Sequence, residues 1–345
     1  MKKINRKWAI PLSIAVCLVI MYICTVMGIA SISFQNANRI LLHEIFHLNI
    51  DLGGISDGSI TIIRNVRLPR VVLGFLAGAS LAVCGCGFQG IFKNPMADPF
   101  VLGVSSGAAL GASIGIVLHF DTRFLGMSGT TVLAFAGAFL TILLVYNISK
   151  VGKKVPVSTL LLSGIAVSQT LSAAMSVIMI MNKQSMDQIM FWTMGSLNGK
   201  GWNQIVSVLP YSILGILLLF TTCRELDIML TGEDAAIQLG VNVEFLKKKV
   251  LFAATVITAA VISVTGIIGF VGLVVPHIVR MITGPKHRTL MPLSLIFGGT
   301  FLIICDTAAR SLAVWEVPVG IITSLCGGPF FIYLLSRMKK GGNFS

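Results

Sequence analysis

The chain alternates long apolar segments with short polar gaps along its whole length. The apolar segments cover residues 8–31, 68–92, 99–119, 124–147, 157–181, 202–222, 250–271, 273–282, 290–312 and 318–336. A helix that crosses a bilayer needs about 20 apolar residues, and only helices suit such segments because lipid does not tolerate unpaired backbone groups. The pattern therefore predicts an all-α, polytopic membrane protein with about ten transmembrane helices.

The basic residues predict how these helices are oriented. With the N-terminus in the cytoplasm and ten crossings, most lysines and arginines fall in cytoplasmic gaps, as they do in membrane proteins generally. The segment 273–282 is short, but omitting it would place Arg337, Lys339 and Lys340 outside, against this rule. We therefore expect a multi-pass protein of the cell membrane with both termini in the cytoplasm.

Composition leaves no room for a separate water-soluble domain. The chain has 345 residues, of which 55% are hydrophobic and 11% charged, with a mean hydropathy of +0.90. Soluble domains are about a quarter charged. We expect one transmembrane domain over residues 1–345, in contact with lipid, and we interpret the net charge of +13 as a topology signal rather than a nucleic-acid-binding surface.

Two local features have structural rather than functional interpretations. The first apolar run, from Trp8 to about Ala30, is too long for a secretory signal, so we expect it to form the first helix. The seven cysteines form no CxxC pair and lie mostly inside apolar segments, which is typical of small packing residues.

Residues His43, Glu44 and His47 form a literal HExxH motif. On a helix this motif places two imidazoles on one face for zinc and supplies a glutamate as base, so a membrane metalloprotease is one hypothesis. The motif lies in the first external gap, however, and the later histidines offer no evident third ligand. A short surface or interfacial helix is the interpretation that we favour.

The chain contains no nucleotide-binding motif of its own. The stretch from Gly195 to Gly201 lacks the GxxxxGK[ST] spacing, so any ATP hydrolysis must belong to a partner. Ion-coupled carriers usually bury acids along an ion path, whereas here only Asp306 lies clearly within a segment, with Arg310 one turn later. We interpret these two residues as a locally neutralised pair, which weakens the hypothesis of a secondary carrier.

Arg64, Arg67 and Arg70 lie in the same first external gap or at its edge, where positive charge is disfavoured. Their spacing of three places them near one helical face, and with Arg310 they would form a basic rim. The residues alone leave two interpretations open: the arginines extend to lipid headgroups, or they receive acidic residues of an external protein.

The longest cytoplasmic gap covers about residues 223–249. Thr231 is a good cap for a short helix with Glu233 and Asp234 in its first turn, and Gly240 is a good end for it. We expect two short helices separated by this glycine. Such a compact projection suits a docking partner, although a solvated loop is the alternative.

Several motifs, in order along nearly the whole chain, resemble those of the FecCD family, the ten-helix permeases of binding-protein-dependent ABC importers for iron-siderophores, haem and cobalamin. They are Arg67-Leu-Pro-Arg70, Gln89-Gly-Ile-Phe-Lys-Asn94-Pro95-Met96-Ala97-Asp98-Pro99, Leu102-Gly-Val-Ser-Ser-Gly107-Ala-Ala109, Gly232-Glu-Asp-Ala-Ala-Ile-Gln-Leu-Gly240, Gly269-Phe-Val-Gly-Leu-Val-Val-Pro276-His277 and Pro318-Val-Gly320-Ile.

The resemblance implies roles for particular residues. Binding-protein docking would fall to Arg67, Arg70 and Arg310, and the cytoplasmic gate to Asn94, Pro95 and Met96. The outer gate would fall at Asn182, Lys183, Gln184 and Ser185, although the local spacing departs from the family pattern. Coupling to the ATPase would fall to Gly232, Glu233, Asp234, Ala235, Ala236, Gln238, Leu239 and Gly240.

The resemblance also implies the partners. Two permeases, either two copies of this chain or this chain and a paralogue, would work with two cytoplasmic ATPases and an extracytoplasmic binding protein. The chain itself would be no enzyme and bind no cofactor, since ATP is used by the partner. An iron-siderophore-type chelate is the expected cargo, with haem or cobalamin as the alternative.

Overall fold

The computed structural model describes residues 6–28, 30, 32–48, 50–120, 123–124, 127–152, 155–311 and 316–339. The α-helices are α1 (Arg6–Val26), α2 (Phe34–Phe46), α3 (Asp57–Thr61), α4 (Leu68–Phe92), α5 (Val104–Val117), α6 (Gly129–Ile148), α7 (Val157–Met181), α8 (Met186–Thr193), α9 (Trp202–Phe220), α10 (Cys223–Met229), α11 (Glu233–Gln238), α12 (Val243–Thr265), α13 (Val271–Thr283), α14 (His287–Ser311) and α15 (Val319–Lys339). Short irregular helices are η1 (Ile62–Arg67), η2 (Pro99–Leu102) and η3 (Lys183–Ser185). The strands β1 (Arg123–Phe124) and β2 (Met127–Ser128) pair antiparallel.

The nearly all-helical class predicted from the apolar pattern is confirmed. Each of the ten apolar segments holds one helix. Within the described part of the chain, seven helical stretches are long and apolar enough to cross a membrane, and three shorter apolar helices accompany them: Val104–Val117, Val271–Thr283 and Val319–Leu334.

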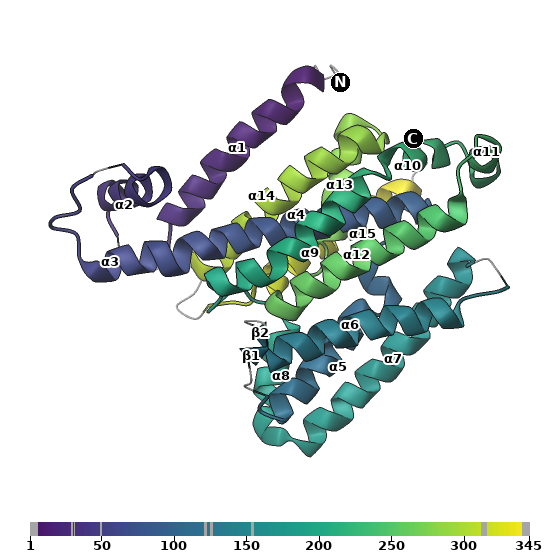
Figure 1. Cartoon of the computed structure of the whole chain (residues 1–345), viewed down its shortest axis with the longest axis horizontal. Coiled ribbons are helices and arrows are strands. Elements are labelled where there is room, and N and C mark those ends of the chain that lie inside the picture. The colour runs from purple at the N-terminus through teal and green to yellow at the C-terminus, as the bar shows by residue number, and fades with distance from the viewer. Residues whose placement is uncertain are drawn as a thin grey trace.

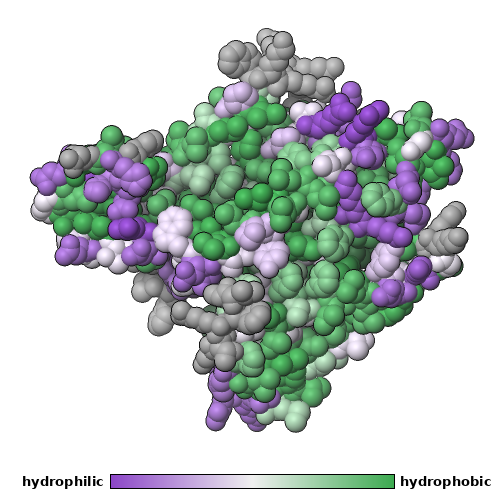
Figure 2. Space-filling model, in the orientation of Figure 1, coloured by the Kyte–Doolittle hydropathy of each residue, from purple (hydrophilic) through white to green (hydrophobic). Residues whose placement is uncertain are grey.

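Helix α4 is the centre of the bundle. Twenty of its residues are buried, and it packs against α9, α12, α13 and α14. Helices α5, α6 and α7 form a neighbouring group that meets the centre mainly through α12, and α1 lies against α14 at the opposite edge (Figure 1). Figure 2 shows a mostly apolar surface across the middle of this face, with polar surface over α2–α3 at one end and over α10–α11 at the other.

Glycines let the helix backbones of this centre approach one another closely. A Cβ added to Gly78 would lie 2.2 Å from the carbonyl oxygen of Gly298 on α14. A Cβ added to Gly85 would lie 1.7 Å from the carbonyl oxygen of Gly272 on α13. The small-residue spacing seen in the sequence therefore serves tight helix packing, as in membrane bundles generally. The predicted packing role also suits six of the seven free cysteines, which are buried.

Helix α7 is the least covered of the long helices. Only 6% of its apolar window is buried. Large side chains along it are open, among them Leu162, Ile165, Ile180 and Met181, the last two with 70% and 78% of their area exposed. One long side of α7 therefore has no partner within the described chain.

Because the Gly85 contact leaves no room for a methyl group, Gly85→Ala is expected to force α4 and α13 apart. Overpacking costs about 1–3 kcal/mol, so the unfolding temperature of the purified protein in detergent should fall. Gly328→Ala on α15 is the matched control, because an added Cβ there meets no atom within 4 Å. Equal unfolding temperatures for the two variants would contradict the tight packing.

Candidate functional site

Contacts between distant segments define two ends of the bundle. At the first, which we name the arginine end, Trp202 donates through Nε1 to the carbonyl of Arg64 at 3.1 Å, and Arg70 reaches Glu316. At the second, the lysine end, the backbone N–H groups of Val155 and His287 donate to Glu244 and Asp227, respectively. Each end therefore brings together loops and helix ends that are far apart in the sequence.

Arg70 forms the main ion pair of the arginine end. Its Nε and Nη2 donate to the carboxylate of Asp306 at 2.9 and 3.0 Å, and its Nη1 donates to Glu316 Oε2 at 3.0 Å. Arg310 Nε lies 4.0 Å from the same Asp306 and its Nη2 donates to the Cys24 carbonyl. The pairing of Asp306 with Arg310 was predicted from their spacing, but the closer partner is Arg70.

Arg67 binds backbone instead of acid. Its two terminal nitrogens donate to the carbonyls of Val26 and Ala30 at 2.5 and 2.6 Å, at the end of α1. It is the last residue of η1, a π-helical turn that joins α3 to α4 without interruption. The side chain therefore ties the end of α1 to the start of α4.

The expectation that Arg67, Arg70 and Arg310 form an exposed rim is wrong for the isolated chain. Their exposed fractions are 3%, 5% and 4%, because acids and carbonyls of this chain already hold them. Arg64 is the open arginine here, with 60% of its side chain exposed, and it pairs with Glu44 at 3.3 Å. Whether the three buried arginines take part in docking stays a prediction.

The HExxH motif ends an amphipathic helix. Ser33 caps α2, and His47 lies beyond its last turn in the left-handed region, with φ of 50°. Glu44 is held by Arg64 rather than directed toward the two imidazoles as a base. Among the described residues, no three His, Cys, Asp or Glu side chains are grouped to hold a metal ion. The geometry matches the surface-helix interpretation.

The predicted outer-gate residues lie between two helices, α7 and α8. Helix α7 ends at Met181, and the side-chain amide of Asn182 donates to the Ile178 carbonyl at 2.9 Å. Lys183, Gln184 and Ser185 form η3 and lead into α8. Lys183 and Gln184 are exposed and Ser185 is buried. The chain thus turns sharply here, at the end of its least covered helix.

The predicted cytoplasmic-gate residues form a tight turn after α4. Lys93 ends α4 in the left-handed region, and Asn94 Oδ1 accepts the N–H of Met96 at 2.9 Å. Pro95 and Met96 are partly exposed, and Asp98 then caps η2 by accepting the N–H of Phe100 at 2.9 Å. The turn is therefore fixed by side-chain caps at both of its ends.

Burial raises the pKa of Asp98 to about 6, and the hydrogen bond from Phe100 opposes this shift only in part. The carboxyl sits next to the backbone of Gly272 at the start of α13. An acid whose pKa is raised binds its proton more tightly in the folded state, so stability is lost as the pH rises from about 4 through 6.

The predicted coupling residues project at the lysine end. Glu233 and Asp234 occupy the first turn of α11, and Gly240 follows it with φ of +83°, as predicted. Two details were wrong. Gly232, not Thr231, precedes the helix, and Thr231 donates to the Ile228 carbonyl instead. The second short helix is the first part of α12, which begins at Val243 after an Asn242 cap.

The projection is joined to the bundle by hydrogen bonds that the sequence did not reveal. Asp227 on α10 accepts from the backbone and ring of His287 at the start of α14. Burial acts to raise the pKa of Asp227, but these hydrogen bonds outweigh it and hold that pKa below its ordinary value. Around α11, Leu239 and Ile237 are exposed, at 65% and 56%, which suits a surface that meets another protein.

Replacing Asp98 with asparagine is expected to keep the cap and remove the buried charge. The unfolding temperature of Asp98→Asn should exceed that of the unaltered protein at pH 7.5, and the difference should shrink at pH 5, where Asp98 is largely protonated. The exposed Asp187→Asn serves as control. A difference of the same size at both pH values would contradict the raised pKa.

The model of the FecCD transport family matches residues 15–337. The chain is 45% identical to the cobalamin import system permease protein of Halobacterium salinarum, covering 82% of this chain and 75% of that one. It is 40% identical to the hemin transport system permease protein of Yersinia pestis, covering 80% and 83%. It is 34% identical to an Fe(3+)-citrate import system permease protein of Bacillus subtilis, covering 97% and 98%.

Among solved structures, the chain is similar to one described as the inward-facing conformation of a candidate metal-chelate type ABC transporter. The TM-score is 0.81 at 29% identity, and the likeness covers 95% of this chain and 98% of that one. The likeness in sequence and in fold thus extends over nearly the whole chain, and the protein belongs to the FecCD transport family of membrane permease subunits.

Proposed function

We propose that this chain is the permease subunit of an ATP-driven importer for a metal chelate of the iron-siderophore type. The observation that carries the proposal is the whole-length likeness to a metal-chelate transporter chain. The sequence supports it, because it has a membrane bundle and a polar projection but no nucleotide-binding motif. ATP would be hydrolysed by partner subunits.

The proposed topology has ten crossings with the lysine end in the cytoplasm. The seven long and three short apolar helices supply the crossings. Lys93, Lys247 and Arg288 lie at the lysine end, which suits the cytoplasmic excess of positive charge. The arginine end then faces outward, where most of its arginines are neutralised or bound to carbonyls within the chain. One domain over residues 1–345 would contain all of these parts.

The proposed assembly pairs this chain with a second permease, two ATPases and a binding protein. The open side of α7, which ends at the candidate outer gate, suits contact with a second copy or a paralogue along a shared pathway. The exposed apolar residues of α11 suit a cleft in the ATPase. Alternating opening of the segments 94–96 and 182–185 would pass the chelate across.

At the arginine end, docking by an acidic protein has to compete with a group of this chain. Glu316 holds Nη1 of Arg70 and is 30% exposed, so it occupies the position that a partner carboxylate would take. Asp306 keeps its own contacts with Arg70 when Glu316 leaves. Charge pairing of this kind governs orientation and encounter rate more than affinity.

Cobalamin and haem are the alternative cargoes, favoured by relatives of 45% and 40% identity that carry those names. Purified chain, its ATPase and its binding protein in liposomes are expected to take up a ferric hydroxamate siderophore in an ATP-dependent manner. Hemin and cyanocobalamin are tested in parallel. Uptake of hemin alone or of cyanocobalamin alone would move the assignment to that chelate. Uptake without the ATPase would favour a secondary carrier.

Glu44→Ala is expected to leave uptake unchanged, because Glu44 only pairs with Arg64 near the surface. Radiolabelled chelate uptake measures this directly. Loss of uptake in this variant, together with a zinc content that falls in proportion, would reopen the metalloprotease hypothesis.

Glu316→Gln is expected to strengthen docking, because it removes the competitor for Arg70 while Asp306 still neutralises that arginine. A rise in binding-protein affinity of about twofold to fivefold corresponds to one partly exposed ion pair. Surface plasmon resonance on the reconstituted permease measures it. Reversal of Arg70 to glutamate is a poorer test, since a new carboxylate beside Asp306 would disturb the fold. Unchanged or weaker docking of Glu316→Gln would contradict Arg70 as a docking residue.

A further inference from the structure

Lys247 is a buried lysine at the lysine end, and it joins two elements. It lies on the second turn of α12 with only 10% of its side chain exposed. Its Nζ pairs with Glu233 on α11 and lies 3.6 Å from Glu244 Oε1 on its own helix. Two acids therefore neutralise one buried ammonium, and one of them belongs to the projecting helix.

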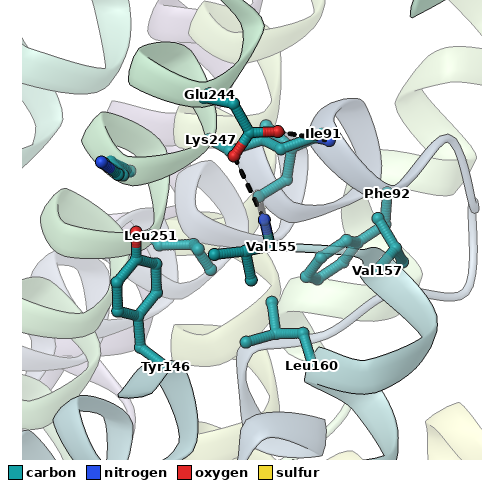
Figure 3. Close-up of a pocket in the computed structure, with 10 residues that line it drawn as sticks. Ile91, Phe92, Tyr146, Val155, Val157, Leu160, Glu244, Lys247 and Leu251 are labelled. Carbon is teal, nitrogen blue, oxygen red and sulfur yellow. Dashed lines mark hydrogen bonds and ion pairs between the residues drawn. The ribbon is translucent and has the colours of Figure 1, made fainter. Parts of the chain in front are cut away.

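Glu244 continues this contact to α7. Its other carboxylate oxygen, Oε2, accepts the backbone N–H of Val155 at 3.3 Å (Figure 3). Val155 is 4% exposed and is followed by Pro156, the residue that caps α7. Proline fixes its own φ and restricts the backbone of Val155, so these two residues form a stiff connection to the start of α7. Helix α7 then runs without a break to Met181, next to segment 182–185.

Beneath these ionic groups, apolar side chains close the junction. Phe92, Tyr146, Val155, Leu160 and Leu251 surround a space of about 10 Å³ (Figure 3). That volume admits one water at most, so the junction is a packed contact and not a ligand site. Phe92 is the last residue of α4 and lies two positions before Asn94. The same junction therefore includes the end of the helix that leads into the predicted cytoplasmic-gate segment.

Loss of Glu233 would leave the buried ammonium with Glu244 alone, at 3.6 Å, which is unfavourable, so Lys247 is expected to follow Glu233 when α11 moves. We propose that Lys247 is a positioning residue that transmits movement of the ATPase-docking helix α11 to α7 and to the segment after α4, through Glu244 and Val155. The role rests on the proposed function, because it requires that α11 meets an ATPase.

Lys247→Met tests the relay, since methionine keeps much of the length and packing of lysine without its charge. Lys248→Met, exposed on the next position of α12, is the matched control. Both variants are reconstituted with ATPase and binding protein, and three quantities are measured: bound ATPase per permease, ATP hydrolysis rate, and chelate imported per ATP hydrolysed. A purely structural role would lower the first two together with the third.

The relay predicts that Lys247→Met keeps bound ATPase and hydrolysis within about twofold of the unaltered chain. Chelate imported per ATP should drop at least fivefold, and Lys248→Met should not change it. The conservative Lys247→Arg should restore most of the import, because it keeps a positive charge for Glu233 and Glu244. Normal import by Lys247→Met, equal loss of all three quantities, or no rescue would overturn the relay. Absence of ATP-dependent import by the unaltered chain would instead contradict the proposed function itself.

Discussion

The structure depends on one constraint: a chain that lies in lipid must satisfy its own polar groups. Arg70 and Asp306 show how this is done, with a two-point ion pair between α4 and α14 in which the exposed side-chain fractions are 5% and 3%. A bare charge in such surroundings is costly, so each member fixes the position of the other. Arg67 and Arg310 extend the arrangement by donating to carbonyls of α1 and of the segment after it.

The two ends of the bundle use ionic contacts for opposite purposes. At the arginine end they are buried and redundant, since Asp306 faces two arginines, and they hold α1, α4 and α14 as one body. At the lysine end they lie between elements of different kinds, from a projecting helix to the start of α7. A rigid arginine end and a linked lysine end suit an importer in which force is applied at the lysine end, as the proposed topology requires.

The sequence predicted features that depend on neighbours along the chain. The ten apolar segments became helices, and the acidic first turn of α11 and its terminal glycine were placed correctly. Features that depend on distant residues were missed: Arg70 and Asp306 are 236 positions apart, and no local pattern pairs them. The exposed rim failed for the same reason, because burial of an arginine depends on which helices pack over it. Thr231 was a reasonable cap by residue type, but Gly232 adopts φ of +124° and begins α11 in its place.

Gln169 stands near the middle of α7, the least covered of the long helices, on exposed surface between Ser168 and Thr170. A glutamine amide that faces hydrocarbon is unfavourable, whereas the same amide in a water-lined space between two permeases is hydrated. A single copy of this chain is therefore less stable in the bilayer than a copy within the assembly. A partner that binds only the folded chain stabilises it by mass action, so the amount of folded protein in a membrane would depend on the supply of its assembly partner.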